Sequence, residues 1–375
     1  MTPIWAGLAR SWRSSSGTAI RSSPVASVET DDAAMSAPLR LRIRVETMVA
    51  YHRPDRDHVR TSLHPQARSV LEEIEAFGPR SSDSLSIEDR RRLEHTEPRF
   101  SGNPQPVGAT RDVEIDGPAG KVTLRLYIPD APPPHAQVLF IHGGGWALGA
   151  IEFADPLCRA LCRASGMLIG SVEYRLAPEH KFPAGLEDAY AALQWLDANA
   201  TANGSRRGPI AVCGDSAGGN LAAAVAQMSR DRGGPLIALQ VLIYPALDPT
   251  LSRPSMTTCA TGYGLTRDDM RLFWDLYLRT PRDAADPYAC PPRAKSLAGL
   301  PPALIVTAEF DPLVDEGEAY GAQLTADGAD ATVTRYPGMI HGFIGYLGRV
   351  DAARDAVAEC GDALKAAMRK GLPTS

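Results

Sequence analysis

The chain has 375 residues, of which 44% are hydrophobic and 22% charged, and its formal net charge is −5. A chain of this length and hydrophobic content can bury one large core or two medium ones, which excludes wholesale disorder. The small acidic excess gives no reason to expect binding to nucleic acid, which depends on neutralising phosphates, and every apolar run is far shorter than the ~20 residues that a membrane-spanning helix needs.

Residues 1–35 differ in composition from everything after them. They carry three arginines and many serines, and no acidic residue precedes Glu29. A secretory signal is not indicated, because the apolar stretch is too short. The composition favours a disordered extension, with Met35 as an alternative start, over an organellar transit peptide.

Residues 36–100 are expected to form an N-terminal helical segment. Two short polar helices are predicted there, one over 64–77 and one after Ser86. The second contains the charge run Glu88-Asp-Arg-Arg-Arg92, which is typical of a solvated helix face. Prolines and glycines over 98–108 predict a linker.

From residue 101 to 375 the pattern becomes that of one α/β domain. Residues 111–115 and 121–128 are predicted to form a hairpin around the turn at 116–120. Short apolar runs then alternate with helical patterns, which indicates a mainly parallel central sheet with helices on both faces. The predicted strands are 137–141, 167–172, 209–213, 236–244, 303–308 and 331–336, and the predicted helices are 155–165, 186–199, 217–230, 316–326 and 351–369.

Residues 249–281 interrupt this alternation and contain a predicted helix over 266–278. Thr266 can cap that helix, with Asp269 three residues later. An insertion above the carboxyl ends of the strands could roof a ligand site, because ligands bind at those ends. Packing of its aromatic face onto the core is an equally good interpretation.

Gly214-Asp-Ser-Ala-Gly218 lies between a buried-strand pattern and a strong helix pattern. A serine on a sharp strand-to-helix turn needs unusual backbone angles and small neighbours, which the two glycines supply. The turn would expose the Ser216 hydroxyl beside a helix N-terminus, whose dipole favours developing negative charge. Ser216 is therefore the candidate nucleophile.

A serine needs a base, and His341 is the one histidine that follows Ser216 in the chain. It lies in a glycine-flanked loop after the last predicted strand. A base of this kind needs an acid to orient it, and Asp311 directly follows the strand before. Glu309, Asp315 and Glu316 are rival acids; the order serine, acid, histidine is that of α/β-hydrolases.

His142 is followed by Gly143, Gly144 and Gly145, directly after the predicted strand 137–141. Their unobstructed N–H groups, together with that of Ala217, would form an oxyanion hole for a tetrahedral intermediate. A loop that only turns the chain is the alternative, and no lysine follows as a phosphate loop requires. His142 is expected to brace the loop rather than to act as a base.

Together these motifs resemble the hormone-sensitive-lipase family, whose bacterial members are the family IV carboxylesterases. The resemblance covers about residues 61–370 and rests on five motifs: His142–Trp146, Tyr174–Glu179, Gly214–Gly218, Asp311–Leu313 and His341–Phe343. It implies an α/β-hydrolase core with a helical cap formed by 36–100 and the insertion 249–281. Ser216, His341 and Asp311 would be nucleophile, base and acid, and the substrates short- to medium-chain acyl esters.

The resemblance further implies no cofactor, and a homodimer paired through edge strands is typical of it. Val314 and Cys290 depart from the family pattern, which bears on local packing or cap contacts rather than on the triad. The six cysteines, two of them at Cys158 and Cys162, lack metal-ligand spacing and are expected to be core residues. Their usage favours a reducing, cytoplasmic location.

Candidate substrate contacts are Trp146, Asp215, Phe273 and Tyr277, although hydrophobic residues at helical spacing more often form core. The triad does not separate esters from amides, lactones or N-acetyl groups, because all pass through the same kind of tetrahedral intermediate. A receptor that binds a ligand without hydrolysing it is the alternative from a different class.

Overall fold

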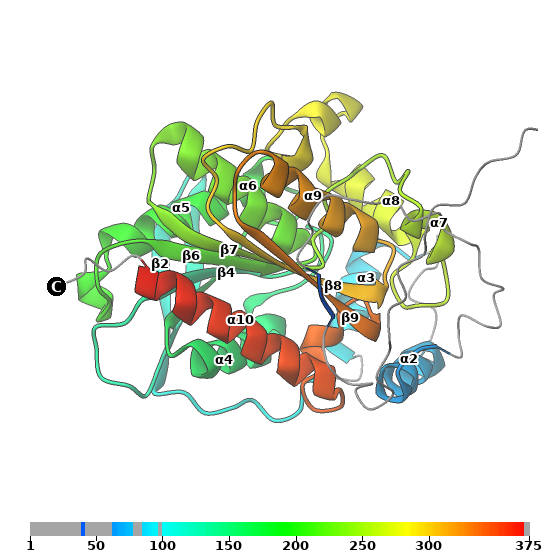
Figure 1. Cartoon of the computed structure of the whole chain (residues 1–375), viewed down its shortest axis with the longest axis horizontal. Helices are drawn as coiled ribbons and strands as arrows, with labels where there is room; N and C mark the ends of the chain where they lie inside the picture. Colours follow the sequence, from blue (N-terminus) through cyan, green and yellow to red (C-terminus); the bar gives the residue numbers. More distant parts are fainter. Residues whose placement is uncertain (1–38, 42–61, 78–84, 97–99, 371–375) are drawn as a thin grey trace, which may run out of the picture. The chain divides into compact units, whose positions relative to one another are not determined.

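The computed structural model describes residues 39–41, 62–77, 85–96 and 100–370. The predicted extension 1–35 lies outside the described residues. Within them the chain forms a nine-stranded sheet in the order β1-β9-β8-β7-β6-β4-β5-β3-β2 (Figure 1). The strands are β1 Leu39–Leu41, β2 Ala109–Gly117, β3 Gly120–Ile128, β4 Gln137–Ile141, β5 Leu168–Val172, β6 Ile210–Asp215, β7 Ile237–Ile243, β8 Ala303–Phe310 and β9 Ala331–Ile340.

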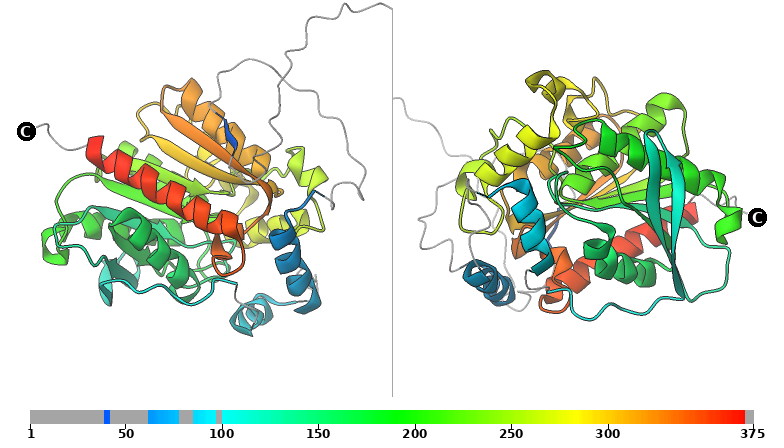
Figure 2. Two further views of the ribbon diagram at one scale, coloured as in Figure 1. Left: turned by 60° about the horizontal axis from the view of Figure 1, so that its bottom comes forward. Right: turned by 180° about the vertical axis from the view of Figure 1, so that it is seen from behind.

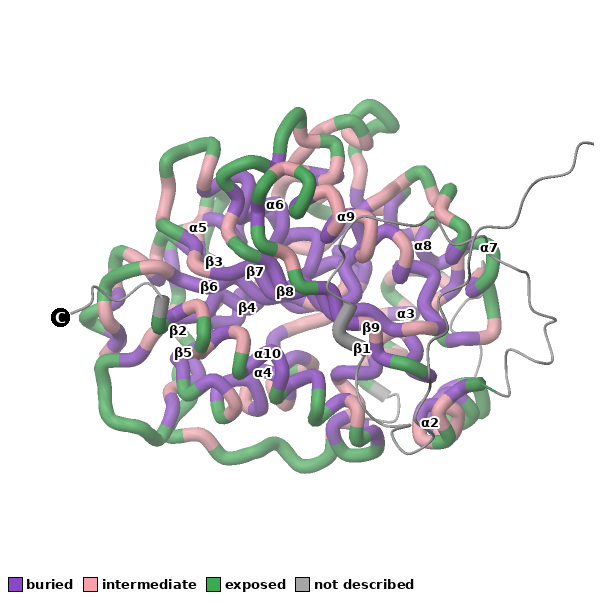
Figure 3. The backbone as a smooth tube through the Cα atoms, in the orientation of Figure 1, coloured by how far each residue is buried: buried purple, intermediate pink, exposed green. Residues whose placement is uncertain are grey.

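Six neighbouring strands run parallel, as the strand–helix alternation predicts; in sheet order they are β5, β4, β6, β7, β8 and β9. β2 and β3 form the predicted antiparallel hairpin, with Ile115 opposite Val122. The central strands are buried along their whole length, which explains their continuous apolar runs (Figure 3). β1 was not predicted; it pairs antiparallel with β9 and makes the sheet edge on that side.

Helices cover both faces of the sheet. α5, α6 and α9 pack on one face, where their apolar side chains join the first of two large core clusters. α4 and α10 pack on the other face and form the second cluster (Figures 1 and 2). These helices are α4 Ile151–Ser165, α5 Ala184–Ala198, α6 Ala217–Arg232, α9 Val314–Ala326 and α10 Asp351–Lys370. Every predicted helix of the core is present, with boundaries shifted by four residues at most.

The insertion 249–281 contains α7 Ser255–Thr258 and α8 Arg267–Tyr277. Thr266 and Asp269 form the predicted capping box at the start of α8. The aromatic side chains of α8 are buried against Trp146 of the loop that follows β4. The helix therefore lies over the carboxyl ends of the strands and packs on the core as well, so the two interpretations are compatible.

Two helices precede the hairpin, α2 Pro65–Phe77 and α3 Ile87–Thr96, close to their predicted positions. The prediction that the α3 charge run is a solvated face is wrong for its two central arginines. Arg90 is 9% exposed and pairs with Asp269, and Arg91 donates to Glu179 and to two main-chain carbonyls. Only the ends of the run, Glu88 and Arg92, are exposed. The charge pattern of the run does not show that other segments of the chain supply partners for Arg90 and Arg91.

Candidate active site

Three strands deliver three side chains to one point at the carboxyl edge of the sheet. Ser216 follows β6, Asp311 follows β8 and His341 follows β9, each directly. His341 Nε2 lies 3.0 Å from Ser216 Oγ, and His341 Nδ1 lies 2.7 Å from Asp311 Oδ2. The imidazole thus bridges a hydroxyl and a carboxylate, the arrangement that activates a serine for attack.

The backbone at Ser216 is strained, with φ 55° and ψ −118°, in a region that non-glycine residues rarely adopt. Its main chain is held on both sides: the N–H donates to Ile243 O over 2.8 Å, and the carbonyl accepts from Asn220 and Ala246. These bonds keep the hydroxyl at the tip of the turn, between the end of β6 and the first turn of α6.

The two glycines of the motif are required by close packing. A Cβ atom at Gly214 would come within 3.0 Å of the Gly218 carbonyl, and one at Gly218 within 3.0 Å of Ile141 O and His142 O. Separations below 3.0 Å are essentially never seen for a real Cβ. Strand β4 and helix α6 therefore meet the turn with no room for a side chain, as the sequence motif predicts.

Asp311 is the acid that reaches His341, and it is fully buried. Its second oxygen, Oδ1, accepts the N–H of Leu313 over 2.8 Å, so both carboxylate oxygens have a donor. The prediction placed this residue directly after a strand ending at 308, whereas β8 continues to Phe310. The extension brings Asp311 to the strand end itself.

The three rival acids each hold a different segment of main chain near the site. Glu309 accepts from the N–H of Gly338, in the strand that leads to His341. Asp315 accepts from the N–H of Ser255, and Glu316 accepts from the N–H groups of Leu247 and Asp248. Burial raises the pKa of Glu316 well above its ordinary value. These acids therefore position the surroundings of the triad.

The glycine loop after β4 is a compact turn. The φ angles of Gly144, Gly145 and Trp146 are +111°, +58° and +58°, and the first two explain why glycine is needed there. Gly144 O accepts from the N–H groups of Ala147 and Leu148, over 3.1 and 2.8 Å. These two hydrogen bonds close the turn.

One of the four predicted oxyanion donors is already engaged. The N–H of Gly143 donates to Asp215 Oδ1 over 2.9 Å, so the prediction for Gly143 is wrong. Among the described residues no acceptor is found for the N–H groups of Gly144, Gly145 and Ala217. These three remain the candidates for binding an oxyanion.

Asp215 was predicted to contact substrate, but its carboxylate is turned to the glycine loop. Burial raises the pKa of Asp215 to about 6, while the hydrogen bond from Gly143 and the nearby His341 act in the opposite direction. A Cβ at Gly143 would fall within 3.0 Å of this carboxylate. The residue before the nucleophile therefore fixes the start of the loop.

His142 braces the loop, as predicted. Its Nδ1 donates to Gly143 O over 2.7 Å, and its ring stacks on Tyr174 with centroids 4.4 Å apart. Burial lowers the pKa of His142 to about 4. The ring therefore stays neutral at neutral pH and carries the Nδ1 proton into that bond.

Two of the aromatic candidates face each other rather than open space. Trp146 is stacked on Tyr277 with ring centroids 4.4 Å apart, and their exposed fractions are 1% and 2%. The ring of Phe273 in α8 lies against Gly145 and leaves no room for a Cβ there. Phe273 is thus the candidate that lies beside the oxyanion donors.

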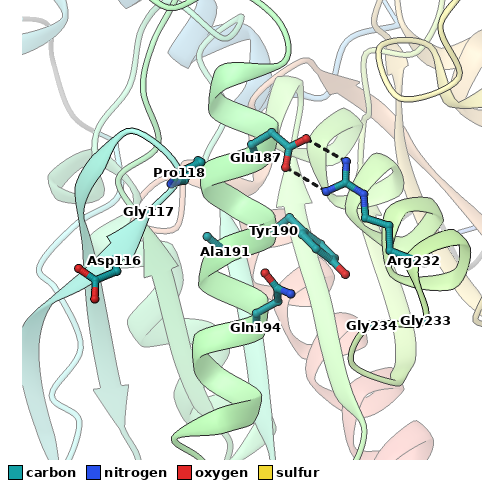
Figure 4. A pocket seen from close by; sticks show the side chains of 10 residues that line it. All are labelled: Asp116, Gly117, Pro118, Glu187, Tyr190, Ala191, Gln194, Arg232, Gly233 and Gly234. Atoms are coloured by element: carbon teal, nitrogen blue, oxygen red, sulfur yellow. Dashed lines mark hydrogen bonds and ion pairs between the residues drawn. The ribbon is translucent and has the colours of Figure 1, made fainter.

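A groove of about 520 Å³ lies elsewhere, beside the β2–β3 turn, α5 and the end of α6 (Figure 4). Its lining includes Tyr190 and the ion pair of Glu187 with Arg232, and none of the triad residues.

The described residues hold no group of His, Cys, Asp or Glu that could bind a metal ion. In the same part of the chain no helix combines the length and apolarity needed to cross a membrane. All six cysteines are buried and unpaired with one another, as expected for core residues.

Comparison with known proteins agrees with this fold. A family model described as the alpha/beta hydrolase fold matches residues 138–345. The carboxylic ester hydrolase LipN of Mycobacterium tuberculosis is 45% identical over 62% of this chain, a match that spans 64% of LipN. The carboxylesterase NlhH of the same species is 41% identical over 69% of this chain and 82% of its own length.

Among solved structures, the hyperthermophilic esterase of the archaeon Pyrobaculum calidifontis is 39% identical. It superposes with a TM-score of 0.75 and covers 81% of this chain and 98% of its own. These matches confirm the fold and the kinship that the motifs predict. The chain belongs to the α/β-hydrolase family, among its carboxylic ester hydrolases.

Proposed function

We propose that Ser216, His341 and Asp311 are the catalytic triad of a carboxylesterase that hydrolyses short- to medium-chain acyl esters. The bridge made by His341 carries the proposal, because one imidazole lies within hydrogen-bond distance of both the hydroxyl and the buried carboxylate. The carboxylate holds the imidazole in the tautomer that accepts the serine proton.

In the proposed reaction Ser216 Oγ attacks the ester carbonyl while His341 Nε2 takes its proton. His341 then gives this proton to the leaving alcohol, and an acyl-enzyme remains. Water, deprotonated by His341, releases the acid and restores the serine. Each step moves one proton between the imidazole and an oxygen, so the chain's own residues supply all the acid–base chemistry.

The oxyanion of each tetrahedral intermediate would be bound by the N–H groups of Gly144, Gly145 and Ala217. Ala217 N lies at the N-terminus of α6, whose dipole favours negative charge. One such donor contributes about 2.7–4 kcal/mol to transition-state stabilisation. A fixed loop costs no reorganisation during the reaction, which is why the bonds that hold it matter.

We further propose that α2, α3 and the insertion 249–281 form a cap over this site. Phe273 packs on Gly145, so the cap narrows the space next to the oxyanion donors. This supports a preference for short acyl chains. A homodimer and a cytoplasmic location stay predictions.

The test is the hydrolysis of p-nitrophenyl esters from two to sixteen carbons, with Ser216→Ala as control. We expect turnover that is fastest on short chains and a loss of about 10⁶-fold in the variant, the scale known for serine nucleophiles. Turnover near the wild-type rate in Ser216→Ala would refute the assignment. If no chain length is hydrolysed, labelling of Ser216 by a fluorophosphonate separates an amide or lactone hydrolase from a receptor.

A further inference from the structure

Helix α3 carries three charged side chains, Arg90, Arg91 and Glu94, which we call the α3 anchor. Arg91 and Glu94 bind the loop after β4, and Arg90 binds Asp269 of α8. Arg91 Nε donates to Ala147 O over 2.9 Å, and its Nη2 donates to Ala177 O over the same distance. Both terminal nitrogens also bind the carboxylate of Glu179. One guanidinium therefore joins two loops of the core to a helix that precedes the core in the chain.

Glu94 holds the same loop two residues further on. Its Oε2 accepts the N–H of Gly149 over 3.0 Å. A Cβ at Gly149 would fall within 3.0 Å of Gly143 O and of the His142 ring, so this end of the loop packs directly on its beginning. The anchor thus binds the outer end of the turn whose inner end carries the candidate oxyanion donors.

Main-chain hydrogen bonds connect the outer end of the glycine loop to its inner end. Ala147 and Leu148 donate their N–H groups to Gly144 O. The carbonyl that Arg91 binds belongs to Ala147 as well. Ala147 is thus bonded to Arg91 through its carbonyl and to Gly144 through its N–H. A shift of Ala147 therefore moves Gly144 directly.

Arg90 links α3 to α8. Its Nη1 lies 3.4 Å from Asp269 Oδ1, and both side chains are 9% exposed. Asp269 also closes the capping box of α8, and Phe273 one turn later lies on Gly145. The anchor therefore contacts the loop directly and, through α8, from above.

We propose that α3 is a positioning element of the oxyanion hole, in which Arg91 and Glu94 fix the placement of Gly144 and Gly145 through Ala147 and Gly149. The proposal rests on the function proposed above. It makes Arg91 and Glu94 positioning residues, since neither contacts Ser216, His341 or Asp311. It also gives the N-terminal segment a role in the chemical step in addition to covering the site.

Arg92 is a matched control for Arg91, because it is the next residue on the same helix. Arg92 is 73% exposed, and within the described residues its ion pairs are with Glu88 and Asp89 of α3. Arg91→Ala should lower kcat about 10- to 100-fold, the range that follows from displacing a catalytic group by up to about 1 Å. Arg92→Ala should leave kcat within about twofold of wild type, because a surface pair contributes little.

Conservative variants test the geometry rather than the charge. Arg91→Lys keeps the positive charge, but its donors lie on one atom and cannot reproduce the four hydrogen bonds that the planar guanidinium makes from three separate nitrogens. It should therefore fall with Arg91→Ala. Glu94→Gln keeps a side-chain oxygen for Gly149 and should stay within about threefold of wild type, whereas Glu94→Ala should lose about tenfold.

The readouts separate a positioning role from a purely structural one. The rate is expressed per Ser216 labelled by fluorophosphonate, so that unfolded protein does not count. Binding of an aliphatic trifluoromethyl ketone is measured in parallel, because its adduct with serine carries an oxyanion. In Arg91→Ala the affinity for this ketone should fall by about the same factor as kcat, with KM changed less than about threefold.

A wild-type kcat per labelled serine in Arg91→Ala, with only the melting temperature lowered, would overturn the proposal. So would equal losses in Arg92→Ala. If Arg91→Ala does not fold, Arg91→Lys and the pair Glu94→Ala and Glu94→Gln give the same test. Failure of the esterase assignment looks different, because the wild-type enzyme would then lack ester turnover or Ser216→Ala would retain it.

Discussion

The main-chain N–H of Gly143 donates to Asp215 Oδ1 over 2.9 Å, which joins the glycine loop to the residue before the nucleophile. The two residues are far apart in sequence but lie at the carboxyl ends of neighbouring parallel strands, since Ile141 of β4 pairs with Gly214 of β6. The bond therefore fixes the position of the glycine loop relative to Ser216, the residue after Asp215. It also places a half-buried carboxylate next to the site, and the loss of solvation raises the pKa of that carboxylate to about 6.

This raised pKa predicts a pH-dependent stability. The ordinary pKa of Asp215 is 3.8 and the folded value is about 6, so between these values the native state binds more protons than the unfolded chain. The free energy of unfolding therefore falls as pH rises through this window. Asp215→Asn removes this titrating group. The melting temperature of the variant minus that of wild type should therefore increase from about pH 4 to pH 6.5 and be constant above that pH.

Asp215→Ala is the matched variant for this prediction. It also lacks the titrating group, but only Asp215→Asn keeps an oxygen for the Gly143 N–H. We expect Asp215→Ala to lose about tenfold or more in kcat and Asp215→Asn to lose less, because an unpaired buried donor destabilises the loop. Melting curves of wild type and Asp215→Asn that run parallel from pH 4 to 8 would contradict the pKa assignment.

Much of the fold was predictable because the alternation of strands and helices is a local pattern. The serine turn and the capping box of α8 were predictable for the same reason: each requires particular residue types at fixed short spacing. Strand order is not local. The adjacency of β4 and β6 is what brings Gly143 to Asp215, and no spacing within either motif indicates it.

The arginine run of α3 shows the same limit from another side. A helix with mixed charges is typical of a solvated face, and two of its residues match that expectation. Arg90 and Arg91 do not, because their partners Asp269 and Glu179 lie in segments more than 80 residues away. Pairing of this kind depends on tertiary placement, which the run itself does not encode.

The acid of the triad can be tested against its strongest rival. Asp311→Asn should lower kcat about 10⁴-fold, because an amide favours the wrong tautomer of His341. Asp315→Asn should change kcat less than about threefold, since its side-chain oxygen can still accept from Ser255 N, as Asp315 does now over 2.7 Å. Steady-state kinetics on p-nitrophenyl acetate gives both values; a larger loss in Asp315→Asn would move the acid to that position.

The contact between Gly145 and Phe273 predicts how the cap limits the substrate. Gly145→Ala should lower kcat by about 10² or more, because the added Cβ meets the Phe273 ring and displaces an oxyanion donor. Phe273→Ala in the same chain should recover part of the loss, since it removes the obstacle but leaves alanine at φ +58°.

Phe273→Ala alone should shift the preferred acyl chain to greater length in the p-nitrophenyl series. The ring that it removes lies beside the donors, so the space gained is next to the reacting carbonyl. An unchanged chain-length profile would mean that the acyl group extends away from α8, and the substrate proposal would then have to be revised.

Two glycines of α6 predict different costs for the same substitution. Gly218→Ala places a Cβ against the main chain of Ile141 and His142, neither of which can move without shifting β4. We expect a loss of more than about 4 kcal/mol in the free energy of unfolding. Gly233→Ala, at the C-terminal cap with φ +61° and open space around its Cβ, should cost only about 1–2 kcal/mol for the left-handed backbone. Urea unfolding measures both; equal costs would show that the close approach at the serine turn is relieved by movement of α6, and the turn would then be less rigid than its packing implies.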